Sequence, residues 1–476
     1  MMRPGHARFW LIPGLLAGAG LLLPAFNAMN PARAAADPAP GIAARTVSES
    51  GYKLAPVGRV AVYRPQGLPS GVVLMLSGRN GWDRPSADTA RALAMGGALV
   101  AGISTPDFLQ SLQASRRCVN PNFGIIALAR DLQHRWRLPM YDKPILVGRG
   151  EGAALAYATL ASGPDGAYKA VISADFAPVL GGGRSWCRSG SLKPAAITRP
   201  YRGFAFAPSR HLPSPWIVLS GSRRPALVRF VGRTGSGRLV IASKAQRDEA
   251  LLGQVRPFLA APPVSSDAAL PTGLPLNIVT DPAAPQTDMM AVIYSGDGGW
   301  VGLDKDVAGQ LAHAGISVVG VDSLSYFWSQ RTPQSAALDL SAIIRGYSRH
   351  WRRPRILLIG YSFGADVLPY IVGGLPPPQR AQVRRLSLLG LSPHADFQFH
   401  MSSWLNLDSN RQYPTIPAIA RLRGLPMLCV RGTLENDSAC PSIPHGLAEM
   451  VVVPGGHHFD RNAPLLVNHM LKGLTI

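Results

Sequence analysis

The clearest candidate for chemistry is Ser362, in the segment Gly360-Tyr-Ser362-Phe-Gly364 that follows the apolar run 355–359. This spacing predicts a strand, a sharp turn and the start of a helix, with the serine hydroxyl projecting beyond the strand. The N–H of Phe363 would then lie at the N-terminus of the helix and point toward negative charge that develops on a carbonyl oxygen. We therefore predict that Ser362 is the nucleophile of an acyl-transfer reaction, in preference to an ordinary glycine turn.

A nucleophilic serine needs a base and an acid, and candidates follow in the chain order nucleophile, acid, histidine that accompanies this type of turn. Glu435 and Asp437 come after the predicted strand 427–432. Their spacing favours Glu435 and their residue type favours Asp437; we prefer Asp437, with Glu435 as the alternate. His457 follows two glycines after the last predicted strand and is the predicted base, with His458 as the alternate.

Two further loops are expected at the same edge of the sheet. A glycine-rich loop should supply the second oxyanion donor, from the backbone of Gly296 or Asp297. Asp322, Tyr326 and Trp328 follow the next predicted strand and could bind substrate, because aromatic side chains suit an apolar or lipid pocket. The alternative is that these aromatic residues only pack the loop down. Negative charge around this edge would favour a cationic group on the substrate, and it comes from Asp297, Asp304, Asp306 and Asp322.

The sequence contains two repeats of the same order of motifs. VVLMLSGRNGW (72–82) corresponds to MAVIYSGDGGW (290–300), and PILVGRGEGA (144–153) corresponds to RILLIGYSFGA (355–365). Continuously apolar strands alternate with helical segments in both repeats, which predicts mainly parallel sheets covered by helices on both faces. We predict tandem α/β-hydrolase-like domains at 37–264 and 265–476, joined by a Pro- and Ala-rich linker.

The first repeat has lost the catalytic residues. Glycine stands where Ser362 stands in the second repeat, and Arg223 and Arg224 occupy the place of the acid. No histidine follows the last predicted strand of this repeat. Without nucleophile, acid and base it cannot run this chemistry, so we expect only the second repeat to be catalytic.

Composition indicates an exported protein. Residues 1–36 combine a positive start, an apolar run and small residues, which predicts a cleaved signal peptide. The four cysteines predict two disulfides, and we prefer Cys118–Cys187 and Cys429–Cys440 because each pair stays within one repeat. No pair has the spacing of a zinc site, and no metal or organic cofactor is implied.

The formal net charge of +21 favours a polyanionic partner. For an exported protein an anionic lipid surface is the better candidate, and we expect no nucleic acid.

The motifs YSGDGGW, VDSLSYFW, IGYSFGADVLP and PGGHHFD resemble those of the VirJ/AcvB bacterial virulence proteins. The resemblance is strongest in the second repeat, and the two-repeat length is similar to the AcvB-like form. It implies a periplasmic protein associated with type IV secretion, and hydrolysis of the aminoacyl ester of phosphatidylglycerol, such as the lysyl or alanyl ester. It carries Ser362 over as the nucleophile, with Asp437 and His457 as its partners.

Two other functions fit the same residues. The protein could be a non-catalytic periplasmic adaptor that contacts secretion-system proteins, since the first repeat already shows the fold without a nucleophile. It could also be a general carboxylesterase, because all such esterases use the same three groups.

Overall fold

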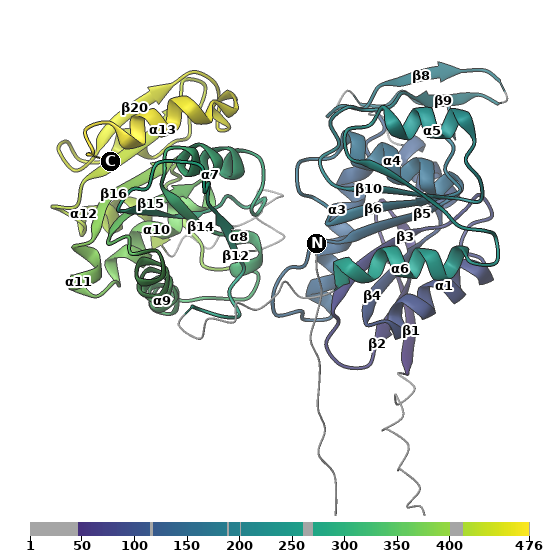
Figure 1. Cartoon of the computed structure of the whole chain (residues 1–476), viewed down its shortest axis with the longest axis horizontal. Helices are drawn as coiled ribbons and strands as arrows, with labels where there is room; N and C mark the ends of the chain where they lie inside the picture. Colours follow the sequence, from purple (N-terminus) through teal and green to yellow (C-terminus); the bar gives the residue numbers. More distant parts are fainter. Residues whose placement is uncertain are drawn as a thin grey trace, which may run out of the picture. The chain divides into compact units, whose positions relative to one another are not determined.

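The computed structural model describes residues 46–114, 118–187, 190–199, 201–259, 270–399 and 413–475. The predicted signal peptide at 1–36 and the predicted boundary near residue 265 lie outside these ranges. Two large sheets are present, each with helices on both of its faces (Figure 1). Among the described residues, no helix is long and apolar enough to cross a bilayer.

The first sheet has eight strands, in the order β1-β2-β4-β3-β5-β6-β10-β11. The pairs β1–β2 and β2–β4 are antiparallel, and every other pair is parallel. The strands are β1 (Val47–Leu54), β2 (Gly58–Pro65), β3 (Gly71–Leu76), β4 (Ala98–Ile103), β5 (Ile145–Arg149), β6 (Ala170–Ala174), β10 (Trp216–Ser220) and β11 (Gly237–Ile241). A separate three-stranded sheet contains β7 (Val179–Gly181), β8 (Pro194–Ile197) and β9 (Gly203–Phe206).

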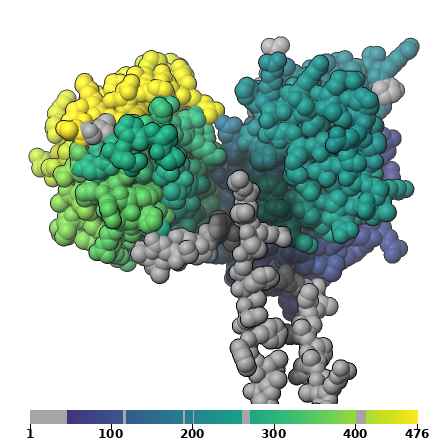
Figure 2. Space-filling view, in the orientation of Figure 1, coloured from purple at the N-terminus to yellow at the C-terminus, as the bar shows by residue number. Residues whose placement is uncertain are grey.

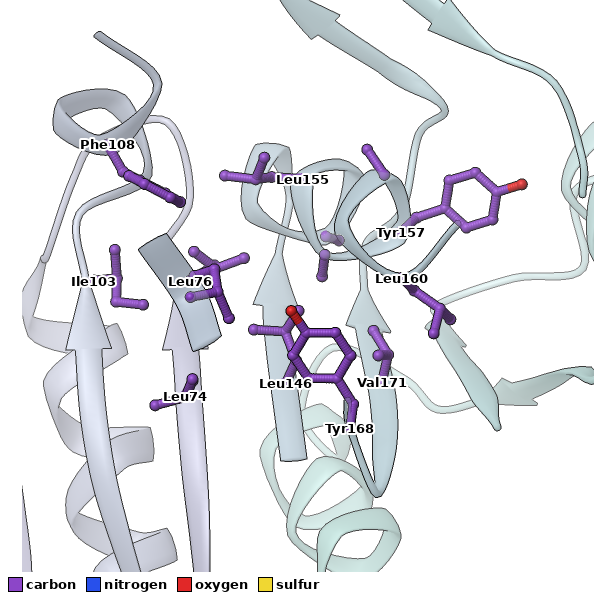
Figure 3. Close-up of a cluster of buried hydrophobic side chains, with 14 of the residues drawn as sticks. Leu74, Leu76, Ile103, Phe108, Leu146, Leu155, Tyr157, Leu160, Tyr168 and Val171 are labelled. Carbon is purple, nitrogen blue, oxygen red and sulfur yellow. The ribbon is translucent and has the colours of Figure 1, made fainter. Parts of the chain in front are cut away.

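The helices of this half divide between two buried clusters, one on each face of the sheet. One cluster receives side chains from α2 (Thr105–Ala114), α3 (Pro121–Arg135), α4 (Glu151–Ser162) and α5 (Pro225–Gly232). The other receives them from α1 (Arg84–Met95) and α6 (Arg247–Leu259). Figure 3 shows part of the first cluster, where Phe108 of α2 and Leu155 of α4 face strand residues such as Leu76 and Leu146. Burial on both faces explains why these strands lack polar alternation.

The second sheet has seven strands, in the order β12-β14-β13-β15-β16-β19-β20, and only the pair β12–β14 is antiparallel. The strands are β12 (Leu276–Val279), β13 (Met289–Tyr294), β14 (Ser317–Val321), β15 (Arg355–Tyr361), β16 (Val383–Leu389), β19 (Met427–Gly432) and β20 (Glu449–Val453). This is the order of the first sheet without its strand β1. The predicted mixed α/β fold with mainly parallel sheets is confirmed.

The helices of the second half also cover both faces of their sheet. α9 (Pro333–Trp351), α10 (Phe363–Gly373) and α12 (Thr415–Ala420) pack on one face, and α7 (Leu303–His313) and α13 (Ala463–Leu471) pack on the other. Short elements connect them: α8 (Ser323–Tyr326), α11 (Pro377–Arg380), and the two-residue strands β17 (His394–Ala395) and β18 (Tyr413–Pro414). The loops after β13, β14, β15, β19 and β20 all leave the carboxyl edge of the parallel sheet, where sites of such folds lie.

Both predicted disulfides are present. Cys118 is joined to Cys187, and Cys429 is joined to Cys440. The second bridge closes a short loop that contains Glu435 and Asp437, so it restrains the segment in which the catalytic acid was predicted.

Candidate active site

Ser362 occupies the sharp turn between β15 and α10. Its backbone has φ 52° and ψ −120°, a conformation that is rare for a residue with a side chain. The flanking glycines make this turn possible. A Cβ on Gly360 would lie 2.5 Å from the carbonyl oxygen of Gly364, and a Cβ on Gly364 would overlap the carbonyl oxygen of Tyr294. The predicted elbow is therefore built by close packing of the helix start against β13 and β15.

A continuous chain of hydrogen bonds links Ser362 to a histidine and an acid. The Oγ of Ser362 lies 2.8 Å from Nε2 of His457, and Nδ1 of this ring lies 2.6 Å from Oε1 of Glu435. The structure brings the predicted base His457 to Ser362, and it brings the alternate acid Glu435, in place of the preferred Asp437, to the histidine. Asp437 is exposed, while Glu435 has only 4% of its side chain exposed and holds the histidine.

The backbone of the acid loop explains why Glu435 reaches the histidine. β19 ends at Gly432, whose N–H donates to Oε2 of Glu435 at 3.1 Å, while Oε1 stays on the imidazole. A Cβ on Gly390 would lie 2.8 Å from Cε1 of His457, so only glycine leaves room for the ring after β16. Three strand ends thus fix one imidazole between the acid and the nucleophile.

The charges of this pair are set by their mutual hydrogen bond. For His457, the bond to Glu435 raises the pKa above its usual value, although burial opposes the rise. For Glu435, burial alone would raise the pKa, but hydrogen bonds from His457 and from the N–H of Gly432 bring it below its usual value. The carboxylate therefore stays ionised and stabilises the imidazolium that forms when Ser362 loses its proton.

His458 has a different place. Its Nδ1 lies 2.6 Å from the hydroxyl of Tyr361, the residue that precedes the nucleophile. Burial is the main cause that raises the pKa of Tyr361, so this phenol remains neutral. The alternate base is thus a neighbour of the turn and does not contact Ser362.

The predicted oxyanion residues surround the nucleophile. The N–H of Phe363 is the first of α10, and the first N–H groups of a helix have no acceptor within it. Gly296 is buried beside Ser362, since a Cβ added to it would lie 3.5 Å from the serine Cβ. Asp297 follows on the exposed side of the loop. Beneath the loop, burial raises the pKa of Asp304 well above its usual value, while the N–H of Gly296 lowers it. Gly296 and Asp297 therefore both remain candidates for the second donor.

The residues predicted to bind substrate are packed into the protein. Tyr326 and Trp328 are 1% and 3% exposed, and Asp322 is 6% exposed. The hydroxyl of Tyr326 donates to Asp339, and the ring of Trp328 stacks on His134 at a centroid distance of 3.8 Å. Their burial agrees with the alternative, in which these residues pack the loop down, and it does not place them in an open pocket beside Ser362.

Asp322 is also occupied by other groups. Its carboxylate accepts from the N–H of Ser325 at 3.1 Å, which caps the start of α8, and lies 3.3 Å from Nζ of Lys143. A cationic substrate group would have to displace that lysine. Of the four aspartates predicted to attract such a group, only Asp297 is exposed.

Sequence reasoning missed one buried acid close to the nucleophile. Asp366 lies in the first turn of α10, and its carboxyl accepts from the N–H of Ser392 at 2.7 Å. Burial raises its pKa to about 8, so the carboxyl is largely protonated at neutral pH. Asp366 is visible in the sequence four residues after Ser362, but its residue type gives no signal of burial, because aspartates are mostly exposed.

The first repeat retains the turn and lacks its chemistry. Gly150 stands between β5 and α4 with φ 54° and ψ −116°, almost the backbone conformation of Ser362. It has no side chain to attack a carbonyl carbon. Gly150 therefore occupies the position equivalent to Ser362, and the first repeat has no nucleophile there.

Comparison with known proteins finds one family match, and it lies in the second repeat. Residues 288–476 match the family described as "Bacterial virulence protein (VirJ)". The C-terminal repeat is similar to this family, and the term VirJ domain is used below only as a label for this repeat. The match covers β13 to α13 of this VirJ domain and so includes Ser362, Glu435 and His457. No curated protein matches the chain.

Solved structures with similar folds are distant in sequence. A putative dienelactone hydrolase from Klebsiella pneumoniae is 15% identical, with 44% of this chain and 90% of that chain covered and a TM-score of 0.29. An α/β serine hydrolase homologue from Coxiella burnetii is 18% identical, with 42% and 91% covered and a TM-score of 0.31. A lipase-esterase related protein from Clostridium acetobutylicum is 13% identical, with 41% and 98% covered and a TM-score of 0.32. None of these similarities assigns a reaction to the chain.

Proposed function

We propose that the protein is a serine esterase that cleaves the aminoacyl ester of aminoacylated phosphatidylglycerol, such as the lysyl or alanyl ester. The observation that carries the proposal is the unbroken chain from Glu435 through His457 to Ser362, with contacts of 2.6 and 2.8 Å. This arrangement makes a serine hydroxyl nucleophilic at neutral pH.

The chemistry follows from the positions of these atoms. His457 Nε2 takes the proton of Ser362 as its Oγ attacks the ester carbonyl carbon. The N–H of Phe363, together with that of Gly296 or Asp297, stabilises the oxyanion. Collapse of the tetrahedral intermediate breaks the bond to the lipid oxygen, and His457 returns the proton to that oxygen. Phosphatidylglycerol leaves, and the aminoacyl group stays on Ser362 as an ester. Water, deprotonated by His457, then attacks this ester and releases the free amino acid and the serine.

The substrate class is supported by two features. The motifs of the second repeat resemble a family in which this activity is expected, and the VirJ match covers the same region. In addition, Asp297 is exposed in the loop beside the nucleophile, where a carboxylate can attract the ammonium group of an aminoacyl ester. A general carboxylesterase would have no need of an acidic group at that place.

The proposed location is the periplasm. The two disulfides are consistent with an exported protein, because disulfides persist in oxidising compartments. Aminoacylated phosphatidylglycerol would be reached from the same compartment. Contact with secretion-system proteins, which the resemblance implies, is part of this proposal and is separate from catalysis.

The test is release of free lysine or alanine from vesicles that contain lysyl- or alanyl-phosphatidylglycerol. Wild-type protein should release amino acid, and Ser362→Ala should not. Ser442→Ala, at an exposed serine of the same domain, is the matched control and should behave as wild type. Rapid cleavage of simple esters with no release from either lipid would favour the general carboxylesterase. No cleavage of any ester by wild type would favour the adaptor.

A further inference from the structure

The positive charge of the protein is concentrated in the repeat that has lost its catalytic residues. Residues 46–259 contain 28 Lys and Arg against 11 Asp and Glu, a formal net charge of +17. Residues 270–475 contain 16 against 14, a net charge of +2. An attraction for polyanions is therefore a property of the first repeat, and the VirJ domain contributes little to it.

Within the first repeat, the positive charge is concentrated in one segment of the chain. The segment 176–247 has 13 Lys and Arg and no Asp or Glu. It forms the small sheet β7–β9, the strands β10 and β11 at one edge of the large sheet, and α5 (Figure 1). We call this segment the acid-free segment. Its arginines cannot be neutralised by acids of the same stretch of chain, so any counter-charge must come from outside it.

The basic side chains of the acid-free segment gather over one face of the large sheet. Leu227 and Val231 of α5, and Leu180 and Phe206 of the small sheet, belong to the same buried cluster. Both elements therefore cover the same face, and their outward side chains point to the same side of the domain. Figure 2 shows this half from one side, with its surface coloured from purple to teal along the sequence.

Most of these basic side chains are exposed and have no carboxylate partner within the described part of the chain. Six lie on α5 with its flanking residues or around β8 and β9: Lys193, Arg199, Arg202, Arg223, Arg229 and Arg233. By contrast, Arg247 at the end of the segment is paired with Asp175 at 2.6 Å. Unpaired, solvated arginines in such number repel one another, and a surface of negative charge would relieve that repulsion.

Exposed apolar side chains are interspersed with the basic ones. Tyr201 lies between β8 and β9 and is 37% exposed, Val228 of α5 is 40% exposed, and Ile241 at the end of β11 is 41% exposed. The phosphates of nucleic acids bind basic side chains, but nucleic acids make few favourable contacts with exposed aliphatic groups. A lipid bilayer with anionic headgroups binds both kinds of side chain favourably, because aliphatic groups enter the interface while arginines stay at the phosphates.

We propose that the acid-free segment docks the protein on an anionic lipid bilayer, and that this docking is the function retained by the first repeat. The inference extends the proposed function, because it names the surface that brings the VirJ domain to a lipid ester. It does not depend on hydrolysis, since the occupant is recognised by headgroup charge and interfacial apolar groups.

The test measures binding of the full chain to vesicles that carry no aminoacyl group. Binding to vesicles of phosphatidylglycerol and phosphatidylcholine is compared with binding to phosphatidylcholine alone, by sedimentation at several salt concentrations. A basic residue near an anionic surface strengthens binding roughly fivefold. The triple variant Arg223→Gln, Arg229→Gln, Arg233→Gln should therefore weaken binding to the anionic vesicles roughly 100-fold, and the wild-type preference should fall with salt.

A matched control removes the same charge from the VirJ domain. Arg345→Gln, Arg349→Gln, Arg384→Gln changes three exposed arginines, two on α9 and one on β16. Its binding should stay within threefold of wild type. Both triple variants should cleave a soluble ester at the wild-type rate, which shows that they are folded.

Three results would overturn the proposal. Equal losses in both triple variants would mean that total charge, and no particular surface, attracts the bilayer. Equal binding to charged and neutral vesicles would remove the electrostatic argument. Tight binding to duplex DNA without binding to anionic vesicles would assign the surface to nucleic acid. Normal vesicle binding with no release of amino acid from aminoacyl lipid would instead refute the proposed function and leave the docking surface intact.

Discussion

Replacing each candidate acid by its amide tests whether Glu435 or Asp437 is the acid that acts on His457. Glu435→Gln keeps the size of the side chain and keeps an oxygen for the N–H of Gly432. It removes the charge that faces Nδ1 of His457 at 2.6 Å. The amide can also turn its NH₂ toward the ring and hold the wrong tautomer, with the proton on the nitrogen that faces Ser362.

The expected loss is large because the contact is buried and charged. The corresponding change from acid to amide in a serine-histidine-acid site lowers kcat about 10⁴-fold. That loss corresponds to roughly 5.5 kcal/mol of transition-state stabilisation. Asp437→Asn should change kcat less than about twofold, since Asp437 is exposed and charge changes at such sites have small effects.

The assay is kcat for a soluble ester, measured for both variants alongside their thermal unfolding. If Glu435→Gln keeps most of the activity while Asp437→Asn loses it, the acid assignment is refuted. If Glu435→Gln loses activity together with its folded state, Glu435→Asp decides the matter: it should fold and recover part of kcat, because the charge returns about one methylene farther from the ring.

Three further outcomes are expected. Gly364→Ala should lower the free energy of unfolding by roughly 3 kcal/mol, since its Cβ would overlap a carbonyl oxygen of β13. Gly373→Ala, at the open end of the same helix, should change it by less than ~1 kcal/mol in the same urea titrations. Replacing Cys429 and Cys440 by Ala should cost roughly 3 kcal/mol and should also lower kcat, because the freed loop carries the acid. Finally, kcat/KM should fall as the pH falls through the raised pKa of His457, with a midpoint above pH ~6.5. Removal of the acidic partner should move this midpoint to lower pH.

The parts of the site that could be predicted are those fixed by local sterics. Gly360 and Gly364 are needed wherever a helix begins so close to its own strand, so the G-x-S-x-G pattern predicts the position of Ser362 without knowledge of the fold. The mainly parallel sheets followed from the continuously apolar strands, and both disulfides followed from reading the chain as two repeats. His457 followed from its position after the last strand.

The choice of acid and the orientation of the aromatic side chains could not be predicted, because both depend on contacts between distant segments. Glu435 and Asp437 are two residues apart in one loop, and the path of the backbone from Gly432 decides which carboxylate turns inward. Tyr326 and Trp328 were predicted at the site because they follow a strand at the right edge, yet a strand end does not determine whether an aromatic ring faces a pocket or a neighbouring segment. Such choices are settled by packing, which local sequence does not report.

The two elbows show which features of the motif belong to the fold and which belong to catalysis. Gly150 adopts nearly the conformation of Ser362, and a Cβ on either of its flanking glycines would overlap backbone atoms, as in the second repeat. The strained turn therefore persists without a nucleophile, because the approach of helix to strand requires it. A turn of this shape predicts the fold alone. Activity is indicated only where a serine at its tip meets a histidine that a buried acid holds in place, as His457 is held by Glu435.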